Sequence, residues 1–96
     1  MTLYLYTKDT PNTSSCIDTC IDTWPPLLTN GKPRAGTGVD ASKLGTLVRS
    51  DGTTQVTYNG WPLYYYSNDV NSGDTTGQKV DGVWFVISPA GAQINK

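Results

Sequence analysis

The stretch Trp61-Pro-Leu-Tyr-Tyr-Tyr-Ser-Asn-Asp69 places four aromatic rings within six residues and ends in an acidic residue that favours a turn. A shift of the chain against itself by sixty residues aligns it with an earlier stretch, Leu3-Tyr-Leu-Tyr-Thr-Lys-Asp9. Both stretches contain the pattern Tyr-x-Tyr-x-x-Asp, and the same shift aligns Trp24 with Trp84. Six of the thirty-six overlapping residues are identical. The sequence therefore predicts an internal pseudo-repeat.

The repeated pattern defines a set of motif residues in each copy. They are Tyr4, Tyr6 and Asp9 in the first copy, and Tyr64, Tyr66 and Asp69 in the second. In an extended chain, residues two apart lie on the same face of a sheet, so the two motif tyrosines of each copy share a face. Because the opposite faces are also apolar, we expect inner strands, or strands with one face reserved for a ligand. The aspartate follows the expected strand end, where its carboxylate can accept hydrogen bonds from backbone N–H groups two or three residues ahead. A turn-forming role is predicted for it, with a metal or catalytic role as the alternative.

The composition favours a mainly β fold. All eight acidic residues are aspartate, glutamate and histidine are absent, and threonine, serine, asparagine and glycine are plentiful. Strong helix formers are scarce, whereas turn residues are common. A chain of 96 residues suits one domain. We expect a small antiparallel sheet or barrel-like domain over residues 1–96, with an internal pseudo-repeat and one or two short helices.

The charge pattern and the missing histidine exclude several classes of function. A net charge of −1 without a basic stripe argues against a nucleic-acid partner. A chain without histidine has no Ser-His-Asp triad, no Cys-His pair and no histidine metal site. No apolar run approaches eighteen residues, so no transmembrane segment is expected. Met1 and Thr2 lead directly into the first strand, so we expect no signal peptide in this chain.

The remaining segments have recognisable local patterns. Apolar residues at helical spacing predict a helix over residues 15–24, with Ser14 or Ser15 as N-cap and two prolines as the stop. A polar linker is expected over residues 31–38, followed by a helical turn that Asp40 caps and Gly45 ends. Residues 46–58 predict a hairpin with a two-residue Asp-Gly turn. Residues 82–88 predict a strand buried on both faces. The hairpin would separate pseudo-repeat halves of about 2–31 and 62–91.

Taken together, these segments resemble a known family. The motif copies are accompanied by four further segments: Cys16-x3-Cys20-x3-Trp24-Pro-Pro26, Gly38-Val-Asp-Ala-Ser42, the run from Asp51 to Tyr65, and Gly82-Val-Trp-Phe85. Over residues 2 to 91 the chain resembles the bacterial secreted-repeat lipoproteins that carry a Tyr-x-(Phe/Trp/Tyr)-x-x-Asp motif. The resemblance implies an exported protein of the cell envelope or extracellular space, often anchored through a lipidated cysteine and often in tandem copies. It implies no catalytic residue, and the chain has no lipobox cysteine near Met1.

The two cysteines, Cys16 and Cys20, allow three interpretations. They are too few for a zinc site, which needs four ligands. In an exported domain we predict a structural Cys16–Cys20 disulfide, with buried thiols as an alternative. A redox pair is the third possibility, although a thioredoxin-like pair has two intervening residues rather than three. For a disulfide, Cys16 should lie at or before the helix N-cap, because Cβ atoms four residues apart within a helix are about 5–6 Å apart and a disulfide needs about 3.8 Å.

The run Asp69-Val-Asn-Ser-Gly-Asp74 superficially resembles a calcium-binding loop. Its glycine falls one place early and no glutamate closes it, so it does not follow the EF-hand order. An ordinary turn rich in aspartate and asparagine is the preferred interpretation. We predict no metal site and no cofactor.

Five aromatic residues near the second motif are a candidate ligand platform. A glycan, a haem-like ring or a partner protein could contact such a group of rings, whereas in a small domain the same rings can simply fill the core. The residues are Tyr58, Trp61, Tyr64, Tyr65 and Tyr66.

Three functional hypotheses follow. The leading one is a non-catalytic envelope module that binds or spaces, with tandem copies of itself, an envelope protein or a glycan as partner. The second is an extracytoplasmic redox or electron-transfer accessory protein that uses the cysteine pair or the aromatic platform. The third is a hydrolase that uses paired aspartates.

Overall fold

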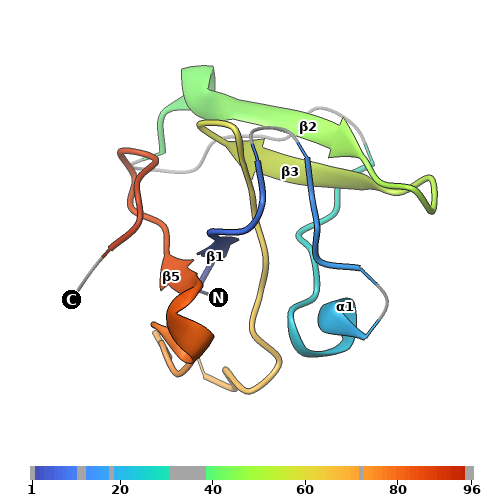
Figure 1. The fold of residues 1–96 in the computed structure, drawn as a ribbon. Coiled ribbons are helices and arrows are strands. Elements are labelled where there is room, and N and C mark those ends of the chain that lie inside the picture. The colour runs from blue at the N-terminus through green and yellow to red at the C-terminus, as the bar shows by residue number, and fades with distance from the viewer. Residues whose placement is uncertain (1, 11–12, 18, 31–38, 72, 95–96) are drawn as a thin grey trace.

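A computed structural model describes residues 2–10, 13–17, 19–30, 39–71 and 73–94. The elements are short and are connected by turns and irregular segments (Figure 1). In chain order they are β1 (Tyr4–Tyr6), the helix α1 (Cys20–Thr23), the 3-10 helix η1 (Ala41–Lys43), β2 (Leu44–Val48), β3 (Thr54–Tyr58), β4 (Trp61–Pro62), the 3-10 turn η2 (Val80–Gly82) and β5 (Trp84–Val86).

The strands form two small antiparallel sheets. In the first sheet β1 pairs with β5, with Leu5 opposite Phe85. The second sheet is a meander in the order β2-β3-β4. In Figure 1 the long β2-β3 hairpin lies across one side of the molecule, and β1, β5 and α1 lie on the other. The mainly β class is confirmed, and the described strands form two separate sheets rather than a closed barrel.

The two motif segments meet at their first tyrosines. Tyr4 and Tyr64 exchange both backbone hydrogen bonds, with N···O distances of 2.8 and 3.0 Å. Other backbone bonds come in pairs that obey the sixty-residue shift. Thr7 donates to Val83 as Ser67 donates to Thr23, and Leu27 donates to Leu63 as Ile87 donates to Leu3. These paired contacts confirm the pseudo-repeat. The exact limits of its halves, 2–31 and 62–91, and the assignment of residues 1–96 to a single domain stay predictions.

The buried core consists of two clusters. The larger one, here called the aromatic core, gathers residues from both motif copies and the first cysteine; its buried members are Tyr4, Cys16, Trp24, Tyr64 and Trp84. The smaller one joins two residues of β3 to the second motif segment and consists of Val56, Tyr58 and Leu63. The motif therefore lies at the centre of the fold rather than on its surface.

The predicted helix over residues 15–24 is wrong in its length. Among the described residues of this range only Cys20–Thr23 are helical, and Thr19, rather than Ser14 or Ser15, is the N-cap. The backbone N–H and the hydroxyl of Ser15 both donate to Asp9, so this serine is committed to the first motif. The described residues before the helix are irregular for this reason.

The hairpin is confirmed, but its turn is longer than predicted. Gly52 N donates to Arg49 O at 2.9 Å and Arg49 N donates to Thr53 O at 2.7 Å, which leaves a three-residue loop. Gly52 has a φ of 87°, the left-handed conformation that closes loops of this kind. Asp40 caps η1 as predicted, because its carboxylate accepts from Ser42 N at 2.9 Å. The chain then enters β2 directly, so Gly45 is a strand residue and not a helix end.

The predicted strand over residues 82–88 is also shorter. Asp81 and Gly82 have φ values of 53° and 68°, conformations that do not continue a strand, and β5 comprises only Trp84–Val86. Trp84 is buried, whereas Phe85 and Val86 are only partly buried, so burial on both faces does not hold. The predicted linker 31–38 lies outside the described residues.

Candidate functional site

Each motif aspartate binds the first tyrosine of the other motif copy. Tyr4 Oη donates to Asp69 Oδ2 at 2.6 Å, and Tyr64 Oη donates to Asp9 Oδ2 at 2.7 Å. The two bonds are equivalent under the sixty-residue shift and both cross between the copies. We call this arrangement the reciprocal clamp.

The second carboxylate oxygen of each aspartate fixes the following loop. Asp9 Oδ1 accepts from the backbone N and the hydroxyl of Ser15, both at 2.7 Å. Asp69 Oδ1 accepts from the backbone N of Thr76 at 3.0 Å and from its hydroxyl at 2.5 Å. The predicted acceptor role is present, but the donors lie six and seven residues ahead rather than two or three. Each aspartate closes a larger loop than an ordinary turn would.

The clamp is buried and its phenols stay protonated. Tyr4 and Tyr64 have no exposed surface, and both aspartates are about 5 % exposed. Burial, and to a smaller extent the neighbouring charge of Asp9, raise the pKa of Tyr64 to about 12. Burial, and then the hydrogen bond to Asp69, raise the pKa of Tyr4. At neutral pH both hydroxyls therefore act as hydrogen-bond donors.

The second tyrosine of each copy caps a continuous stack of four rings. Tyr6 stacks on Trp84 with ring centroids 4.3 Å apart, Trp84 stacks on Trp24 at 3.8 Å, and Trp24 stacks on Tyr66 at 4.2 Å. The corresponding interplanar angles are 17°, 2° and 24°. The two outer rings are only partly buried, whereas the two indoles are buried. We call these four residues the ring stack.

The first tyrosines hold the ring stack edge-on. Tyr4 meets Trp24 at 5.4 Å with an interplanar angle of 79°, and Tyr64 meets Trp84 at 5.2 Å with 89°. Such edge-to-face contacts are a preferred aromatic geometry. The clamp and the ring stack are thus one structure, because the phenols that bind the aspartates also pack against the indoles.

Sequence reasoning missed the role of Gly77. Its backbone N–H donates to Tyr4 Oη at 3.2 Å, and a Cβ atom at this position would lie 2.7 Å from the Trp24 ring. Only glycine allows so close an approach of the backbone to the ring stack. The sequence shows this glycine within a polar loop, which indicates a turn but not a contact with a ring.

The predicted aromatic platform is divided between the two core clusters. Tyr64 and Tyr58 are buried, in the aromatic core and the smaller cluster respectively. Trp61, Tyr65 and Tyr66 are partly buried and keep some accessible surface. Tyr58 Oη donates to the Pro89 carbonyl and accepts from Asp40 N, so its polar atom is already used. Ligand contact through the platform stays a prediction. Trp61, Tyr65 and Tyr66 keep accessible surface for it, and Tyr58 lines a cavity.

A cavity of about 550 Å³ lies beside the smaller core cluster. Its described lining is mostly apolar and contains no charged side chain. It includes Leu3 and Leu63, and Leu27 and Ile87, which are pairs under the sixty-residue shift. Tyr58, from the predicted platform, lies in its wall. Cavities of this size and polarity accommodate small apolar groups.

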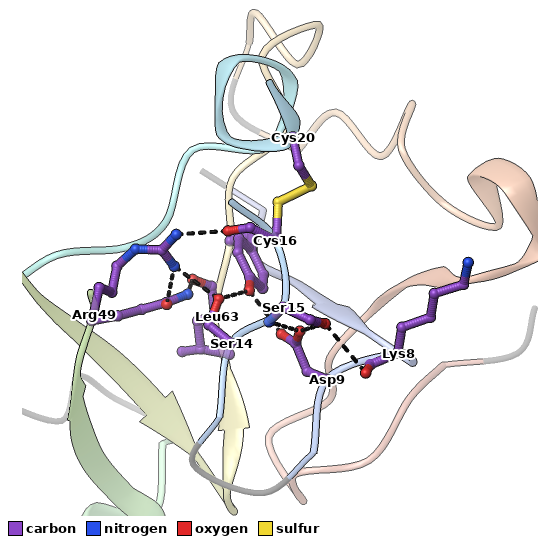
Figure 2. Close-up of a disulfide and its surroundings, with 10 residues drawn as sticks. Lys8, Asp9, Ser14, Ser15, Cys16, Cys20, Arg49 and Leu63 are labelled. Carbon is purple, nitrogen blue, oxygen red and sulfur yellow. Dashed lines mark hydrogen bonds between the residues drawn. A yellow bond between two sulfur atoms is a disulfide. The ribbon is translucent and has the colours of Figure 1, made fainter. Parts of the chain in front are cut away.

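The cysteines form the predicted disulfide. Cys16 and Cys20 are joined with their Cα atoms 5.3 Å apart, and Cys16 precedes the helix N-cap Thr19, as the geometric argument required. Figure 2 shows the Arg49 guanidinium beside this segment. Arg49 Nη2 donates to the Cys16 carbonyl at 2.6 Å, and Nη1 donates to Gln55 Oε1 at 2.7 Å and to Ser14 Oγ at 2.8 Å. Arg49 therefore ties the disulfide segment to the hairpin.

In the loop from Asp69 to Asp74, the Asp74 carboxylate is bonded to the backbone of the loop itself. Asp74 Oδ2 accepts from Asn71 N at 2.9 Å and from Val70 N at 3.0 Å. Both hydrogen bonds lower the pKa of the Asp74 carboxyl, and the bond from Asn71 has the larger effect. Asp69 points inward to the clamp. Among the described residues no three side chains of the metal-binding types form a group.

The fold and the site define a small, disulfide-containing β domain that a reciprocal tyrosine–aspartate clamp closes around stacked aromatic rings. A family described as a secreted repeat of unknown function matches residues 1–28 and 45–88 of the chain. The match covers well over half of the chain, and the chain belongs to this family. No curated protein matches the chain, and no solved structure does. Within the described part of the chain, no helix has the length and apolar character needed to cross a membrane.

Proposed function

We propose that this chain is a non-catalytic module of the cell envelope or extracellular space, in which the motif residues hold the domain together. The observation that supports this proposal is that the polar atoms of the motif clamp bond within the protein. Each aspartate accepts three hydrogen bonds, and both phenols donate to a carboxylate. Among the described residues, no buried side-chain nitrogen or oxygen lacks a hydrogen-bond partner. A substrate would find no group of the reciprocal clamp free to bind or activate it.

The family description supports an exported location. Attachment to the envelope through a lipid, and a bacterial source, are the finer parts of this proposal and rest on the sequence resemblance. A disulfide agrees with an oxidising compartment.

The proposed role is to bind or to space. Binding would use the partly buried rings of Trp61 and Tyr65, with another copy of the repeat, an envelope protein or a glycan as partner. A redox role for the cysteines is less well supported, because Cys16 has no exposed surface and an attacking thiol could reach only the partly buried Cys20. A hydrolase with paired aspartates is also less well supported, because both motif aspartates are buried and bonded.

The proposal is tested by titrating the purified domain with soluble cell-wall glycan fragments and by measuring its self-association in the ultracentrifuge. We expect saturable binding of a glycan or of a second copy. This binding should be lost in Trp61→Ala or Tyr65→Ala. It should be kept in Tyr64→Phe when that variant is measured below its own melting temperature. A response that disappears in folded Tyr64→Phe would contradict a purely structural motif. If neither the glycans nor a second copy gives a saturable response, binding of these partners is wrong and spacing is the role.

A further inference from the structure

The ring stack carries an inference that goes beyond the structural role and does not depend on it. Its four members are the side chains that lose a single electron most readily among the amino acids present, apart from thiols and thioethers. They lie face to face in an unbroken order, Tyr6, Trp84, Trp24 and Tyr66, with centroid separations of 3.8 to 4.3 Å. Face-to-face contact at these separations gives direct overlap of the π systems. An electron can therefore pass between neighbouring rings that are in van der Waals contact, without crossing a wider gap.

The two ends of the ring stack differ from its middle in a way that suits such a path. The indoles of Trp84 and Trp24 are buried, so water does not reach them readily. The phenols of Tyr6 and Tyr66 are partly exposed. A phenol must release its proton when it is oxidised, and this is easiest where water is present. The Tyr66 hydroxyl accepts a hydrogen bond from Asn68 at 3.0 Å in an exposed position, which leaves its own proton free to leave to solvent.

The surroundings contain no competing thiol. Both cysteines of the chain are joined in the disulfide, and Cys16 packs within the aromatic core next to the rings. A buried thiol at this position would lose an electron and a proton to an oxidised indole and end the path there. The disulfide removes that S–H group. The chain also lacks histidine, and its one methionine is residue 1.

We infer that the ring stack is a one-electron relay that passes oxidising equivalents across the domain, from a high-potential one-electron oxidant at one end to a small reductant at the other. The oxidant, an oxidised metal complex or an organic radical, removes one electron from Tyr66, which releases its phenolic proton to water and takes up a proton again when Trp24 supplies it with an electron. The electron deficit moves through Trp24 and Trp84 to Tyr6, which releases its phenolic proton to water. A phenol or thiol reductant then supplies one electron and one proton to Tyr6 and becomes a radical. The protein is unchanged at the end of the cycle, and one proton has been released.

The test attaches a photo-oxidant at one end and measures oxidation at the other. Ser67 is exposed and adjacent to Tyr66, so Ser67→Cys provides a site for a ruthenium polypyridyl label, while the native cysteines stay in their disulfide. Illumination with a cobalt(III) ammine as electron acceptor generates the oxidant at the label. A nitroxide trap marks tyrosyl radicals, and mass spectrometry gives the trapped yields at Tyr6 and at Tyr65, which neighbours the label but is outside the ring stack.

We expect the yield at Tyr6, relative to Tyr65, to be lost in Trp84→Phe and in Trp24→Phe, down to the value for unlabelled protein. Phenylalanine keeps a ring in place but is not oxidised by this label. The matched control is Trp61→Phe, a tryptophan outside the ring stack, which should leave the ratio unchanged. An unchanged ratio in folded Trp84→Phe or Trp24→Phe would overturn the relay.

A second measurement needs no substitution within the ring stack. Time-resolved absorption of the labelled domain should show an indole radical that decays at the rate at which a phenoxyl radical forms. If no indole radical appears before the final phenoxyl radical, the relay is also overturned, because the electron deficit must cross Trp24 and Trp84 to reach Tyr6.

Discussion

At the scale of single residues, the carboxylates of Asp9 and Asp69 explain why the motif contains an aspartate. Each uses one oxygen for its own loop and the other for a tyrosine of the other copy. A serine or threonine six or seven residues ahead supplies both loop donors. The motif thus needs an acid rather than any acceptor, because three donors converge on two oxygens.

Asp69→Asn is expected to lower the free energy of unfolding by about 1–3 kcal/mol, because the amide keeps one acceptor and turns a nitrogen toward Tyr4 or Thr76. Asp69→Ala should cost more, since both acceptors are lost. The matched control is Asp51→Asn, whose Oδ1 alone accepts both bonds from Thr53 in an exposed loop; its cost should stay within about 0.5 kcal/mol. Urea unfolding measures all three. Equal small losses for Asp69→Asn and Asp51→Asn would contradict a role for the second oxygen.

The buried phenols predict a loss of stability at alkaline pH. Burial raises the pKa of Tyr64 from 10.0 to about 12, so the folded state holds its proton where the unfolded state has released it. This contribution is fully present below pH 10 and is lost as the pH rises toward 12. Urea unfolding at a series of pH values should show the decline above pH 10, and Tyr64→Phe should decline less steeply. The same decline in both proteins would assign it to other groups.

At the scale of elements, the structure is held by contacts between short segments rather than by long helices or strands. The helix has four residues, none of them buried, and β4 has two, of which only Pro62 is buried. The ring stack and the clamp supply the packing that these elements lack. The loop that contains Gly77 is part of this packing because it approaches the rings so closely.

Gly77→Ala is expected to destabilise the domain by about 1–3 kcal/mol, because the new methyl group would overlap the Trp24 and Tyr4 rings. Gly73→Ala is the comparison, since its added Cβ meets no atom within 4 Å and its cost comes only from a φ of 89°. Both variants can lose stability, so near-ultraviolet circular dichroism distinguishes them. The signal of the stacked indoles should change in Gly77→Ala and not in Gly73→Ala. An unchanged signal in both would mean that the rings do not need this glycine.

The disulfide should stabilise the domain modestly, because it closes a short loop. The double variant Cys16→Ala/Cys20→Ala is expected to lose about 2 kcal/mol in the free energy of unfolding. Reductant should lower the urea midpoint of the wild type toward that of the double variant. The double variant itself serves as control and should not respond to reductant. A loss several times larger would show that the bond maintains the aromatic core rather than a local loop.

At the scale of the whole molecule, the two motif copies are interdependent. Each copy holds half of the clamp and half of the ring stack, and the backbone bonds between Tyr4 and Tyr64 join them at the centre. Neither copy can bury its own tyrosine beside its own aspartate. The domain should therefore unfold as one cooperative unit.

Fragments test this interdependence. A chain divided between Asn59 and Gly60, which lie in a turn between β3 and β4, gives fragments 1–59 and 60–96. We expect each fragment alone to lack the near-ultraviolet signal of stacked indoles, because Trp24 and Trp84 are separated, and an equimolar mixture to regain it. A native-like signal from either fragment alone would contradict the reciprocal arrangement.

The sequence by itself determined the β class, the pseudo-repeat, the hairpin and the disulfide. These follow from local composition, from the spacing of Tyr4, Tyr64 and their partners, and from the geometry that a Cys16–Cys20 bond requires. Such patterns depend on residue types and on their spacing along the chain, so they can be recognised without knowledge of the fold.

Only the tertiary structure decided which residues the motif contacts. The clamp joins residues 55 and 65 positions apart, and the ring stack is built from residues whose order along the chain does not show their order in space. A tertiary contact also explains why the helix is short. Ser15 donates to Asp9 instead of capping a helix. Hydrogen bonds and ring contacts over such separations depend on how the whole chain packs, and that packing overrides the local preferences from which the sequence is interpreted.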